Sequence, residues 1–454
     1  MAWEGGSLVV EAEGGRVLYW TMGTRHSVAR ATGAAPPIAH VVVVGGGFAG
    51  IAVGRGLANS EVRVTIVDQH NFHTFLPLLY QVATAGLEPA DVAYPIRTIF
   101  GGAPNIGFRH GRVRQVNHAT NTVLLDDATE LNYDHLVIAT GATAAFFGIP
   151  GASQYAMPLY SLADARRLRN KLLLALEDAD ARAEHESVAL TFVVVGGGPT
   201  GVETAGALAE LISIALRRDG LRLDRRRVRV LLVDLADRLL TAFPPSASGY
   251  AARELRALGV EVQFARSVVE VEERAIRFAD GERLETAAVI WAAGVTASGT
   301  LAHGLSVAAG PSGRAQVSSQ LRCVGRENVW AVGDAAAIPS NTSEFCPQLA
   351  PVAIQSGRHC AEQILHAVRG EAMTPFSYRN KGIMATIGRR AAVAKLPQGR
   401  VIRGTLGWLA WLGLHLFYLV GFRNRLRVLI NWTWRYFDWP SGPRLIVADA
   451  ETAD

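Results

Sequence analysis

One short pattern restricts what this chain can fold into more than any other: an apolar strand, a glycine-rich turn and a helix. Residues 41–44 are four valines, and the glycines that follow fit G-x-G-x-x-G at Gly45, Gly47 and Gly50. The first glycine allows a tight turn, the second lets the backbone approach a pyrophosphate, and the third lets helix and strand pack closely. The next apolar strand ends in Asp68, where an acid can accept hydrogen bonds from ribose hydroxyls. These features predict a dinucleotide-binding βαβ unit.

The same pattern returns about 150 residues later, which is the size of one domain. Gly196, Gly198 and Gly201 follow a second apolar strand, and the strand after them ends in Asp234. An acid at this position would repel a 2′-phosphate, so Asp234 favours NADH over NADPH, although the nearby Arg238 softens that preference. The chain is therefore expected to hold two nucleotide folds for two dinucleotides.

A third strand distinguishes the two expected sites. It ends in Gly333-Asp334, and an acid placed there suits the ribityl hydroxyls of FAD, a contact that NAD does not need. The helix that begins near Ala350 follows closely, and a helix N-terminus stabilises the negative charge of a reduced flavin. The strand-then-glycine stretch at 135–142 adds three expected cofactor contacts, which are Ala139, Thr140 and Gly141. Together these features favour FAD plus NADH.

The expected fold class is α/β, with two Rossmann-like dinucleotide-binding domains and a C-terminal amphipathic helical segment that associates with a membrane. The FAD domain is expected to be discontinuous, at 39–160 and 292–385, and the NADH domain to lie at 161–291. The membrane-associating region is placed at 386–454. Residues 1–38 lack the long apolar core of a secretory signal. They are interpreted as a flexible leader that belongs to neither dinucleotide-binding domain.

The tail between residues 404 and 439 is the strongest candidate for contact with a membrane. Residues 404–422 carry no formal charge apart from that of His415 when it is protonated, and arginines flank both ends. Five of the nine tryptophans lie between Trp408 and Trp439. A run of this length could span a bilayer, but its tryptophan and arginine content favours an interfacial helix or hairpin. Burial in the core or in a dimer interface is the third interpretation.

Cysteine spacing excludes several classes of protein. Cys323, Cys346 and Cys360 form no C-x-x-C or C-x-x-x-x-C pair, so neither a disulfide framework nor a metal site is expected. The absence of a cysteine pair after the first glycine motif excludes the disulfide reductases, because they need two thiols against the flavin. The formal net charge of +5 suits an anionic cofactor or an anionic membrane surface and selects neither.

Four stretches make the resemblance specific: 70–97, 196–211, 350–357 and 378–394. They are similar to the type II NADH dehydrogenases, the non-pumping NADH:quinone oxidoreductases of respiratory membranes, and the match runs from about residue 39 to about residue 445. The resemblance implies that NADH passes hydride to FAD, held without a covalent bond, and that a quinone then takes two electrons and two protons.

The resemblance also implies partners and a location. The tail at 404–439 would be a membrane-surface anchor that meets anionic lipids, the protein would be a homodimer, and no nucleic acid would bind. The protein would be peripheral, on the cytoplasmic face of a bacterial inner membrane.

Three catalytic candidates follow from the resemblance. Glu203 would face the nicotinamide side of the flavin, with an early-helix acid that complements the helix dipole as the alternative. Lys381 resembles a lysine near the flavin and the quinone pocket, with a solvated surface lysine as the alternative. Gln355 would reach toward the quinone. The sequence departs here from the family pattern A-Q-x-A-x-Q, because Pro351 replaces the first glutamine. Proline has no backbone N–H to donate.

Three other functions share parts of this pattern. A sulfide:quinone reductase needs a cysteine pair at the flavin, which the sequence lacks. A soluble ferredoxin-type reductase that uses FAD and NADH is the main alternative, but it would not need the aromatic tail. A redox-sensing flavoprotein would be marked by slow turnover with quinone.

Overall fold

The computed structural model describes residues 38–183, 189–218, 221–297, 307–341, 344–437 and 444–447, together with three strands before residue 22. The chain divides into a unit at 1–38 and a unit at 39–454. The first unit was expected from the sequence to be a flexible leader. It contains an antiparallel sheet with the strand order β1-β2-β3. Its strands are β1 (Ala2–Glu4), β2 (Ser7–Ala12) and β3 (Arg16–Thr21).

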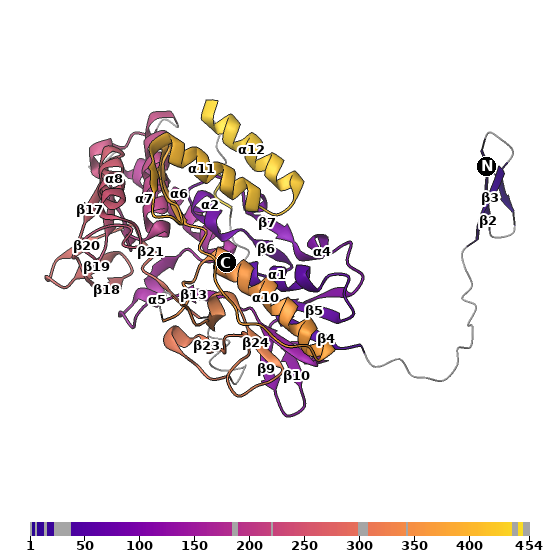
Figure 1. Ribbon diagram of the computed structural model, residues 1–454. Helices are drawn as coiled ribbons and strands as arrows, with labels where there is room; N and C mark the ends of the chain where they lie inside the picture. Colours follow the sequence, from indigo (N-terminus) through magenta and orange to yellow (C-terminus); the bar gives the residue numbers. More distant parts are fainter. Residues whose placement is uncertain are drawn as a thin grey trace. The chain divides into compact units, whose positions relative to one another are not determined.

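The first glycine motif belongs to a five-stranded parallel sheet with the order β24-β12-β4-β5-β8 (Figure 1). Its strands are β4 (His40–Val44), β5 (Arg63–Asp68), β8 (Ile106–His110), β12 (His135–Ile138) and β24 (Val329–Ala331). Valines fill β4 because both faces of a parallel sheet are covered, and Val41, Val42 and Val43 are fully buried. Helices α1 (Phe48–Leu57) and α10 (Ala350–Arg369) pack against each other in this half.

The second glycine motif belongs to another five-stranded parallel sheet, with the order β14-β21-β15-β16-β17. Its strands are β14 (Ala156–Pro158), β15 (Leu190–Val195), β16 (Val228–Val233), β17 (Val260–Gln263) and β21 (Ala288–Trp291). Its helices are α6 (Leu162–Arg182), α7 (Pro199–Arg218) and α8 (Pro245–Ala257). β14 lies within 39–160, the range expected for the first domain, yet it pairs with β21 of the second sheet.

Each half also carries a three-stranded antiparallel sheet. The first consists of β9 (Val113–Asn117), β10 (Thr122–Leu125) and β11 (Glu130–Asn132). The second consists of β18 (Val268–Glu272), β19 (Ala275–Phe278) and β20 (Arg283–Glu285). The chain crosses between the halves through β13 (Ala142–Ala144) and β22 (Val295–Ala297), which pair antiparallel.

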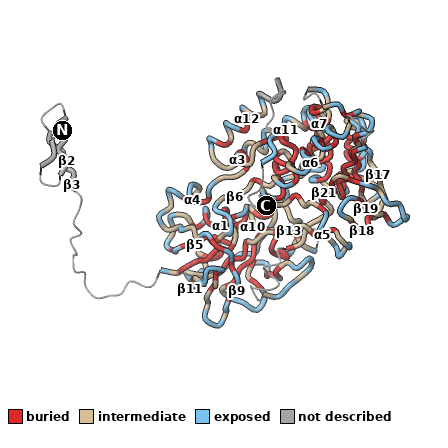
Figure 2. The backbone as a smooth tube through the Cα atoms, turned by 180° about the vertical axis from the view of Figure 1, so that it is seen from behind, coloured by how far each residue is buried: buried red, intermediate tan, exposed pale blue. Residues whose placement is uncertain are grey.

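Short elements connect the first sheet to the rest of the chain. Residues 72–99 form β6 (Phe72–Thr74), α2 (Leu79–Ala83), α3 (Pro89–Val92), β7 (Ala93–Pro95) and α4 (Ile96–Ile99). Further along the chain lie α5 (Ala152–Tyr155), β23 (Ala315–Gln316) and β25 (Ala336–Ala337). The red segments in Figure 2 show that the strands of both parallel sheets are the most deeply buried parts of the chain.

The C-terminal region is a small sheet followed by a helical hairpin. β26 (Ile383–Gly388), β27 (Ala391–Lys395) and β28 (Val401–Arg403) form an antiparallel sheet that packs on α7 and α8. Helices α11 (Gly404–Tyr418) and α12 (Phe422–Phe437) follow (Figure 1). The uncharged run at 404–422 is therefore interrupted after Tyr418. No helix within the described ranges is long and apolar enough to cross a membrane.

Candidate active site

The two glycine turns have nearly identical backbone geometry. Gly45 has a φ of 110° and Gly196 a φ of 111°, in the region that favours glycine. A Cβ on Gly45 would lie 2.3 Å from the carbonyl oxygen of Ala139, which no other residue could tolerate. By contrast, a Cβ added to Gly47 or Gly198 would meet no atom within 4 Å. Each turn therefore leaves open space beside its middle glycine, where a pyrophosphate could approach the backbone.

The acids that end the second strands hold these glycine turns. Asp68 Oδ2 accepts the N–H of Gly46 at 2.6 Å, and its Oδ1 accepts the N–H of His70 at 2.7 Å. Asp234 accepts the N–H of Gly197 in the same way. The sequence predicted a ribose contact for Asp68 and a preference for NADH from Asp234, and it did not predict these bonds. An ionised carboxylate has about four lone-pair directions, so the backbone bonds leave acceptor capacity for a ribose.

The end of β24 contains a buried carboxylate oxygen that the protein leaves unpaired. Asp334 Oδ2 accepts the hydroxyl of Tyr160 at 3.1 Å, whereas its Oδ1 is buried without a partner among the described residues. Burial raises the pKa of Asp334 above its usual value. The hydroxyl of Thr140 is also buried without a partner in this part of the chain. Buried polar atoms are costly when unpaired, so a polyhydroxyl chain such as the ribityl group of FAD fits here.

The start of α10 is tied to the same strand end. Gln348 donates its side-chain amide to the carbonyl oxygen of Asp334 at 3.0 Å, and the N–H of Gly333 donates to the hydroxyl of Ser356 at 3.1 Å. The helix begins at Ala350 with no side-chain cap. An uncapped helix start offers N–H donors and a partial positive charge beside Asp334, which suits the electron-rich edge of a flavin.

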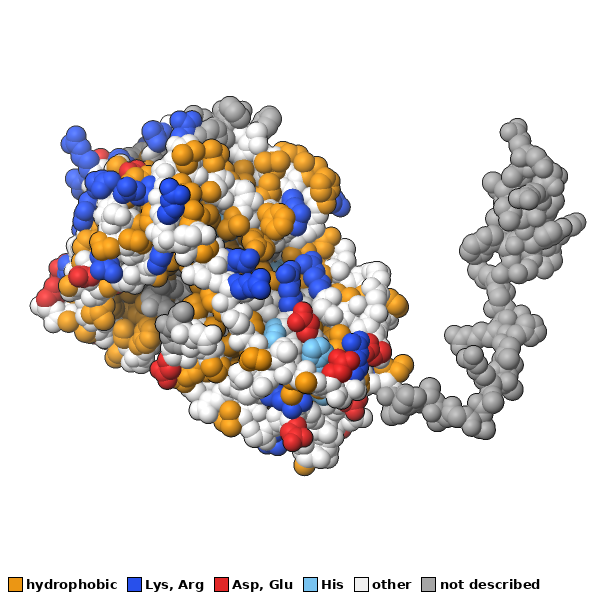
Figure 3. All heavy atoms as spheres, in the orientation of Figure 1, with side chains coloured by type: hydrophobic (Ala, Val, Ile, Leu, Met, Phe, Trp, Pro, Cys, Tyr) orange, Lys and Arg blue, Asp and Glu red, His pale blue; other side chains and the backbone are white. Residues whose placement is uncertain are grey.

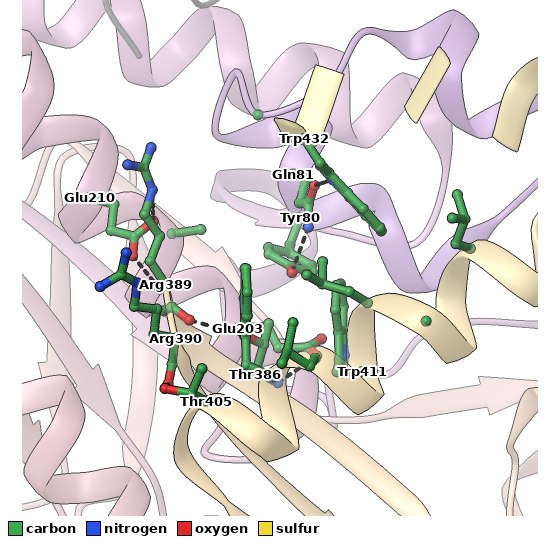
Figure 4. Close-up of a pocket in the computed structure, with 18 of the residues that line it drawn as sticks. Tyr80, Gln81, Glu203, Glu210, Thr386, Arg389, Arg390, Thr405, Trp411 and Trp432 are labelled. Atoms are coloured by element: carbon green, nitrogen blue, oxygen red, sulfur yellow. Dashed lines mark hydrogen bonds and ion pairs between the residues drawn. The ribbon is translucent and has the colours of Figure 1, made fainter. Parts of the chain in front are cut away.

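A cavity of about 720 Å³ lies where α2, α7 and β26 meet the α11–α12 hairpin (Figure 4). Its walls combine aromatic and aliphatic side chains with polar ones, and the charged residues among them are Glu203, Glu210, Arg389 and Arg390. Tyr80, Gln81, Glu203, Thr386, Trp411 and Trp432 are among the residues that line it. This composition is typical of a pocket for an apolar molecule that carries a few hydrogen-bonding groups.

Glu203 is one of two acids that line this cavity, the other being Glu210. It lies in the second turn of α7, and its Oε1 accepts the backbone N–H of Thr386 in β26 at 3.2 Å (Figure 4). Burial raises its pKa to about 8, and the hydrogen bond from the Thr386 N–H offsets only part of that effect. A carboxyl group that is protonated near neutral pH and lines a pocket can act as a general acid.

A hydrogen-bonded chain links α12 to the opposite wall. The indole N–H of Trp432 donates to Gln81 Oε1 at 3.0 Å, and the Gln81 amide donates to the hydroxyl oxygen of Tyr80 at 2.9 Å (Figure 4). Sequence reasoning did not assign any of these three side chains a role. Two signals pointed to them: Tyr80 and Gln81 lie in the stretch at 70–97, and Trp432 belongs to the tryptophan-rich tail.

Two of the three catalytic candidates lie elsewhere. The Gln355 amide donates to the carbonyl oxygen of Arg379 at 3.0 Å and accepts the N–H of the same residue at 3.0 Å. Lys381 is exposed. Neither residue lines the cavity. Gln355 therefore holds a backbone segment in place with both ends of its amide.

The α11–α12 hairpin buries aromatic, aliphatic and polar side chains against the protein and leaves large apolar side chains exposed. Trp411 and Val428 are buried, whereas Leu406 is 71 % exposed, Phe417 67 % and Phe422 80 %. Figure 3 shows these helices covered by hydrophobic side chains at the top of the view. A continuous exposed apolar surface of this kind marks a membrane or protein contact.

Polar contacts fix α12 to the body of the protein. The buried carboxylate of Asp91 accepts the side-chain amide of Asn431 at 2.9 Å and pairs with Arg427 at 3.4 Å. Asn424, one turn earlier, donates to the carbonyl oxygen of Ala93 at 3.4 Å. Asn424, Arg427 and Asn431 share one face of α12 because they are spaced three and four residues apart.

The described part of the chain offers no cluster of metal ligands. Across the described ranges, no group of three or more His, Cys, Asp or Glu side chains could hold a metal ion. The three cysteines are buried as free thiols.

Two family models match the chain. Residues 39–357 match the pyridine nucleotide-disulphide oxidoreductase family, and residues 380–438 match the NDH2 C-terminal domain. The second match covers β26 to α12, the elements that form one side of the cavity.

Several curated proteins are similar over most of their length. The chain is 36 % identical over 434 residues to the type II NADH:quinone oxidoreductase Ndh of Mycobacterium tuberculosis, with 92 % of each chain covered. It is 37 % identical over 412 residues to NdhA of the same organism, with 86 % of each covered. It is 31 % identical to a mitochondrial internal alternative NAD(P)H-ubiquinone oxidoreductase of Arabidopsis thaliana, covering 86 % of this chain and 83 % of that one.

Solved structures share the fold. NDH2 from Plasmodium falciparum, in complex with NADH, superposes with a TM-score of 0.82 at 19 % identity, covering 90 % of this chain and 99 % of that one. The sulfide:quinone oxidoreductase of Aquifex aeolicus superposes with a TM-score of 0.66 at 17 % identity, covering 90 % and 96 %. At these identities the structures establish the α/β fold with two Rossmann-like cores, as the sequence predicted.

Proposed function

The chain belongs to the type II NADH:quinone oxidoreductases, and from this premise we propose that it takes hydride from NADH and delivers two electrons to a membrane quinone. No proton is pumped in this reaction. FAD, when bound, supplies the two-electron chemistry that connects the two substrates. The cavity with the high-pKa acid Glu203 is the observation that carries the proposal, because a quinone must gain two protons as well as two electrons.

The two glycine turns divide the cofactor and the substrate between them. We assign FAD to the first sheet, because the unpaired oxygen of Asp334 lies there. The residues assigned to FAD are Gly45, Gly47, Gly50, Asp68, Ala139, Thr140, Gly141, Gly333, Asp334 and Ala350. Those assigned to NADH are Gly196, Gly198, Gly201 and Asp234. The two backbone bonds that Asp68 accepts support a second role for it, which is to keep its glycine turn in the binding conformation.

Glu203 is proposed to hand a proton to the quinone at one of its ring oxygens. Its pKa of about 8 keeps the carboxyl protonated at neutral pH, and the Thr386 N–H holds the carboxyl group at the cavity wall. A general acid works best when its pKa lies near the working pH. A quinone bound against the aromatic side chains would displace water from this part of the cavity, which would strengthen its polar contacts.

Tyr80 and Gln81 provide a further polar part of the cavity wall. Their hydrogen bond, fixed from the far side by Trp432, places polar groups against the ring of a bound quinone. The cavity also borders the hairpin whose outer face is apolar, so a quinone dissolved in lipid could enter without crossing water.

Gln355 and Lys381 are proposed to act outside the cavity. Gln355 would position the segment at 379–381 through its two bonds to Arg379. Lys381 would then present a cation at the end of that segment. The replacement by Pro351 of the first glutamine in the family pattern makes this half of the motif depend on Gln355 alone.

The hairpin is proposed to dock on the membrane surface. Its apolar face and flanking arginines support attachment to the cytoplasmic face of a bacterial inner membrane as a peripheral protein. A homodimer is a further expectation for this family. Deleting residues 404–454 should release the protein from membranes, and membrane binding that persists would refute this role.

One assay separates this function from the alternatives. Purified protein is assayed with three substrate pairs: NADH and a short-chain quinone, NADH and a ferredoxin, and sulfide and quinone. The loss of NADH absorbance reports the first two reactions, and quinone reduction reports the third. Rapid turnover with NADH and quinone alone is expected. Turnover with ferredoxin but not with quinone would favour the soluble reductase, and very slow turnover with both would favour a redox sensor.

A further inference from the structure

Three arginines from distant parts of the chain lie near one another, because the charges of Arg358 and Arg425 both act on that of Arg55. Arg55 lies in α1, Arg358 in α10 and Arg425 in α12. Helices α1 and α10 cross closely beside Gly56, where an added Cβ would lie 3.8 Å from the carbonyl oxygen of Arg358. The crossing therefore brings Arg55 and Arg358 together.

These charges repel one another without an acid to balance them. Among the residues that the structure describes, neither Arg55 nor Arg358 forms an ion pair with an acid. Burial lowers the pKa of Arg55 from its usual value, and the neighbouring Arg358 and Arg425 lower it further. Like charges that converge in this way favour an anion between them.

The arginine cluster borders the apolar face of the hairpin. Along α12, Phe422 precedes Arg425 by three residues and Leu426 follows it directly, and both apolar side chains are exposed, at 80 % and 47 %. Figure 3 shows basic side chains gathered below the hydrophobic surface at the top of the view. An anion that suits this place would carry both a negative head group and an apolar body.

We propose that Arg55, Arg358 and Arg425 bind the phosphate of an anionic phospholipid whose acyl chains lie along the exposed face of α12. This inference rests on the proposed membrane docking and extends it. Two of the three arginines belong to α1 and α10. The FAD-binding domain would therefore contact the lipid directly, in addition to the C-terminal hairpin. A free phosphate would leave the neighbouring apolar surface unused.

Vesicle binding by the full-length protein tests the proposal. The protein is sedimented with vesicles of phosphatidylcholine alone, or with vesicles that contain about a third phosphatidylglycerol, at physiological salt. The test variant is R55Q/R358Q. The matched control is R112Q/R114Q, which loses the same charge from exposed positions at β9. Arg425 is left unchanged because its Nε also donates to the carbonyl oxygen of Leu419 at 2.7 Å.

Wild type and the control are expected to prefer the anionic vesicles. R55Q/R358Q should lose roughly ten- to thirty-fold of its affinity for those vesicles, because each arginine near an anionic surface contributes about five-fold. Its weaker binding to phosphatidylcholine should not change. Equal binding by R55Q/R358Q and R112Q/R114Q would overturn the proposal.

Two further measurements distinguish a phospholipid from a free anion and from a second subunit. Competition by millimolar inorganic phosphate that abolishes the vesicle preference would assign the cluster to a free anion and overturn the proposal. A change in the oligomeric state of R55Q/R358Q, measured by light scattering, would assign the cluster to a subunit contact, with the same consequence. Turnover of a water-soluble quinone without vesicles reports on the proposed function separately, and R55Q/R358Q should keep it.

Discussion

Glu203 Oε1 accepts the backbone N–H of Thr386 at 3.2 Å, across 183 positions of sequence. The bond fixes an acid of the second Rossmann-like domain against the first strand of the C-terminal sheet. Helices α11 and α12 line the other side, and the acid keeps an intermediate exposure where it borders the cavity. Its raised pKa is a consequence of how these three parts of the chain meet.

Glu203→Gln should separate the two halves of the reaction. The glutamine can still accept the Thr386 N–H but cannot donate an acidic proton, so quinone turnover should fall roughly a hundred- to ten-thousand-fold. Turnover with ferricyanide, which takes electrons without protons, should stay near the wild-type rate. In wild type, quinone turnover should decline as pH rises through about 8, where Glu203 ionises, and the variant should lack this decline. Equal losses with both acceptors would show that Glu203 serves hydride transfer or folding.

The same substitution should change how stability depends on pH. The folded protein holds the proton on Glu203 up to about pH 8, against a usual pKa of 4.5. The folded state therefore binds more protons than the unfolded state in this window, and wild type loses stability as pH rises from about 4.5 to about 8. Glu203→Gln removes this loss, so its melting temperature relative to wild type should be higher at about pH 9 than at about pH 5. Differential scanning calorimetry measures it, and a constant difference at both pH values would contradict the assignment.

The glycine turns could be predicted because they follow from local sequence patterns. Contacts between residues that are far apart in the sequence could not be predicted. Gly45 and Gly196 could be placed because strand, glycine spacing and helix are all encoded within about thirty residues. Asp334 was identified from its strand end, but its partner Tyr160 is 174 positions away. The same limit hid Thr386, the partner of Glu203.

Side-chain roles were the least predictable feature of the site. Gln355 was expected to reach toward the quinone, and its amide instead closes on the backbone of Arg379. A glutamine amide can hydrogen-bond a quinone or a backbone segment equally well. Which of the two it contacts depends on the path of the segment at 379–381, which the sequence does not show. The sequence favoured an interfacial helix or hairpin for the tail but could not fix its two-helix form, because an uncharged run of this length could also span a bilayer as one segment.

Tyr160→Phe should weaken FAD binding. The substitution removes the hydroxyl that donates to Asp334 Oδ2 and leaves a second buried carboxylate oxygen unpaired, at a cost of about 1–3 kcal/mol. Without this bond the Asp334 carboxyl group is no longer held in the orientation in which it would accept hydrogen bonds from the ribityl hydroxyls. The ratio of flavin to protein absorbance after purification should fall, and the melting temperature with it. Tyr155→Phe, which removes a hydroxyl from a more exposed tyrosine of α5, is the control and should change neither quantity. Full flavin content in Tyr160→Phe would show that Asp334 does not need this support.

Trp432→Phe tests whether the hairpin shapes the quinone cavity. Phenylalanine keeps an aromatic ring but removes the N–H that donates to Gln81 Oε1 at 3.0 Å, so Gln81 can turn and the Tyr80 hydroxyl loses its fixed donor. The KM for quinone should rise several-fold, in line with about 1 kcal/mol for one hydrogen bond, while the KM for NADH and ferricyanide turnover stay unchanged.

A double-mutant cycle with Gln81→Met decides whether the effect runs through that bond. If it does, Trp432→Phe should raise the KM for quinone in the wild-type background but add little in the Gln81→Met background. Additive effects of the two substitutions would mean that Trp432 acts through its ring alone. An unchanged KM in both single variants would remove the hydrogen-bonded chain of Trp432, Gln81 and Tyr80 from quinone binding and leave the cavity's selectivity to its aromatic walls.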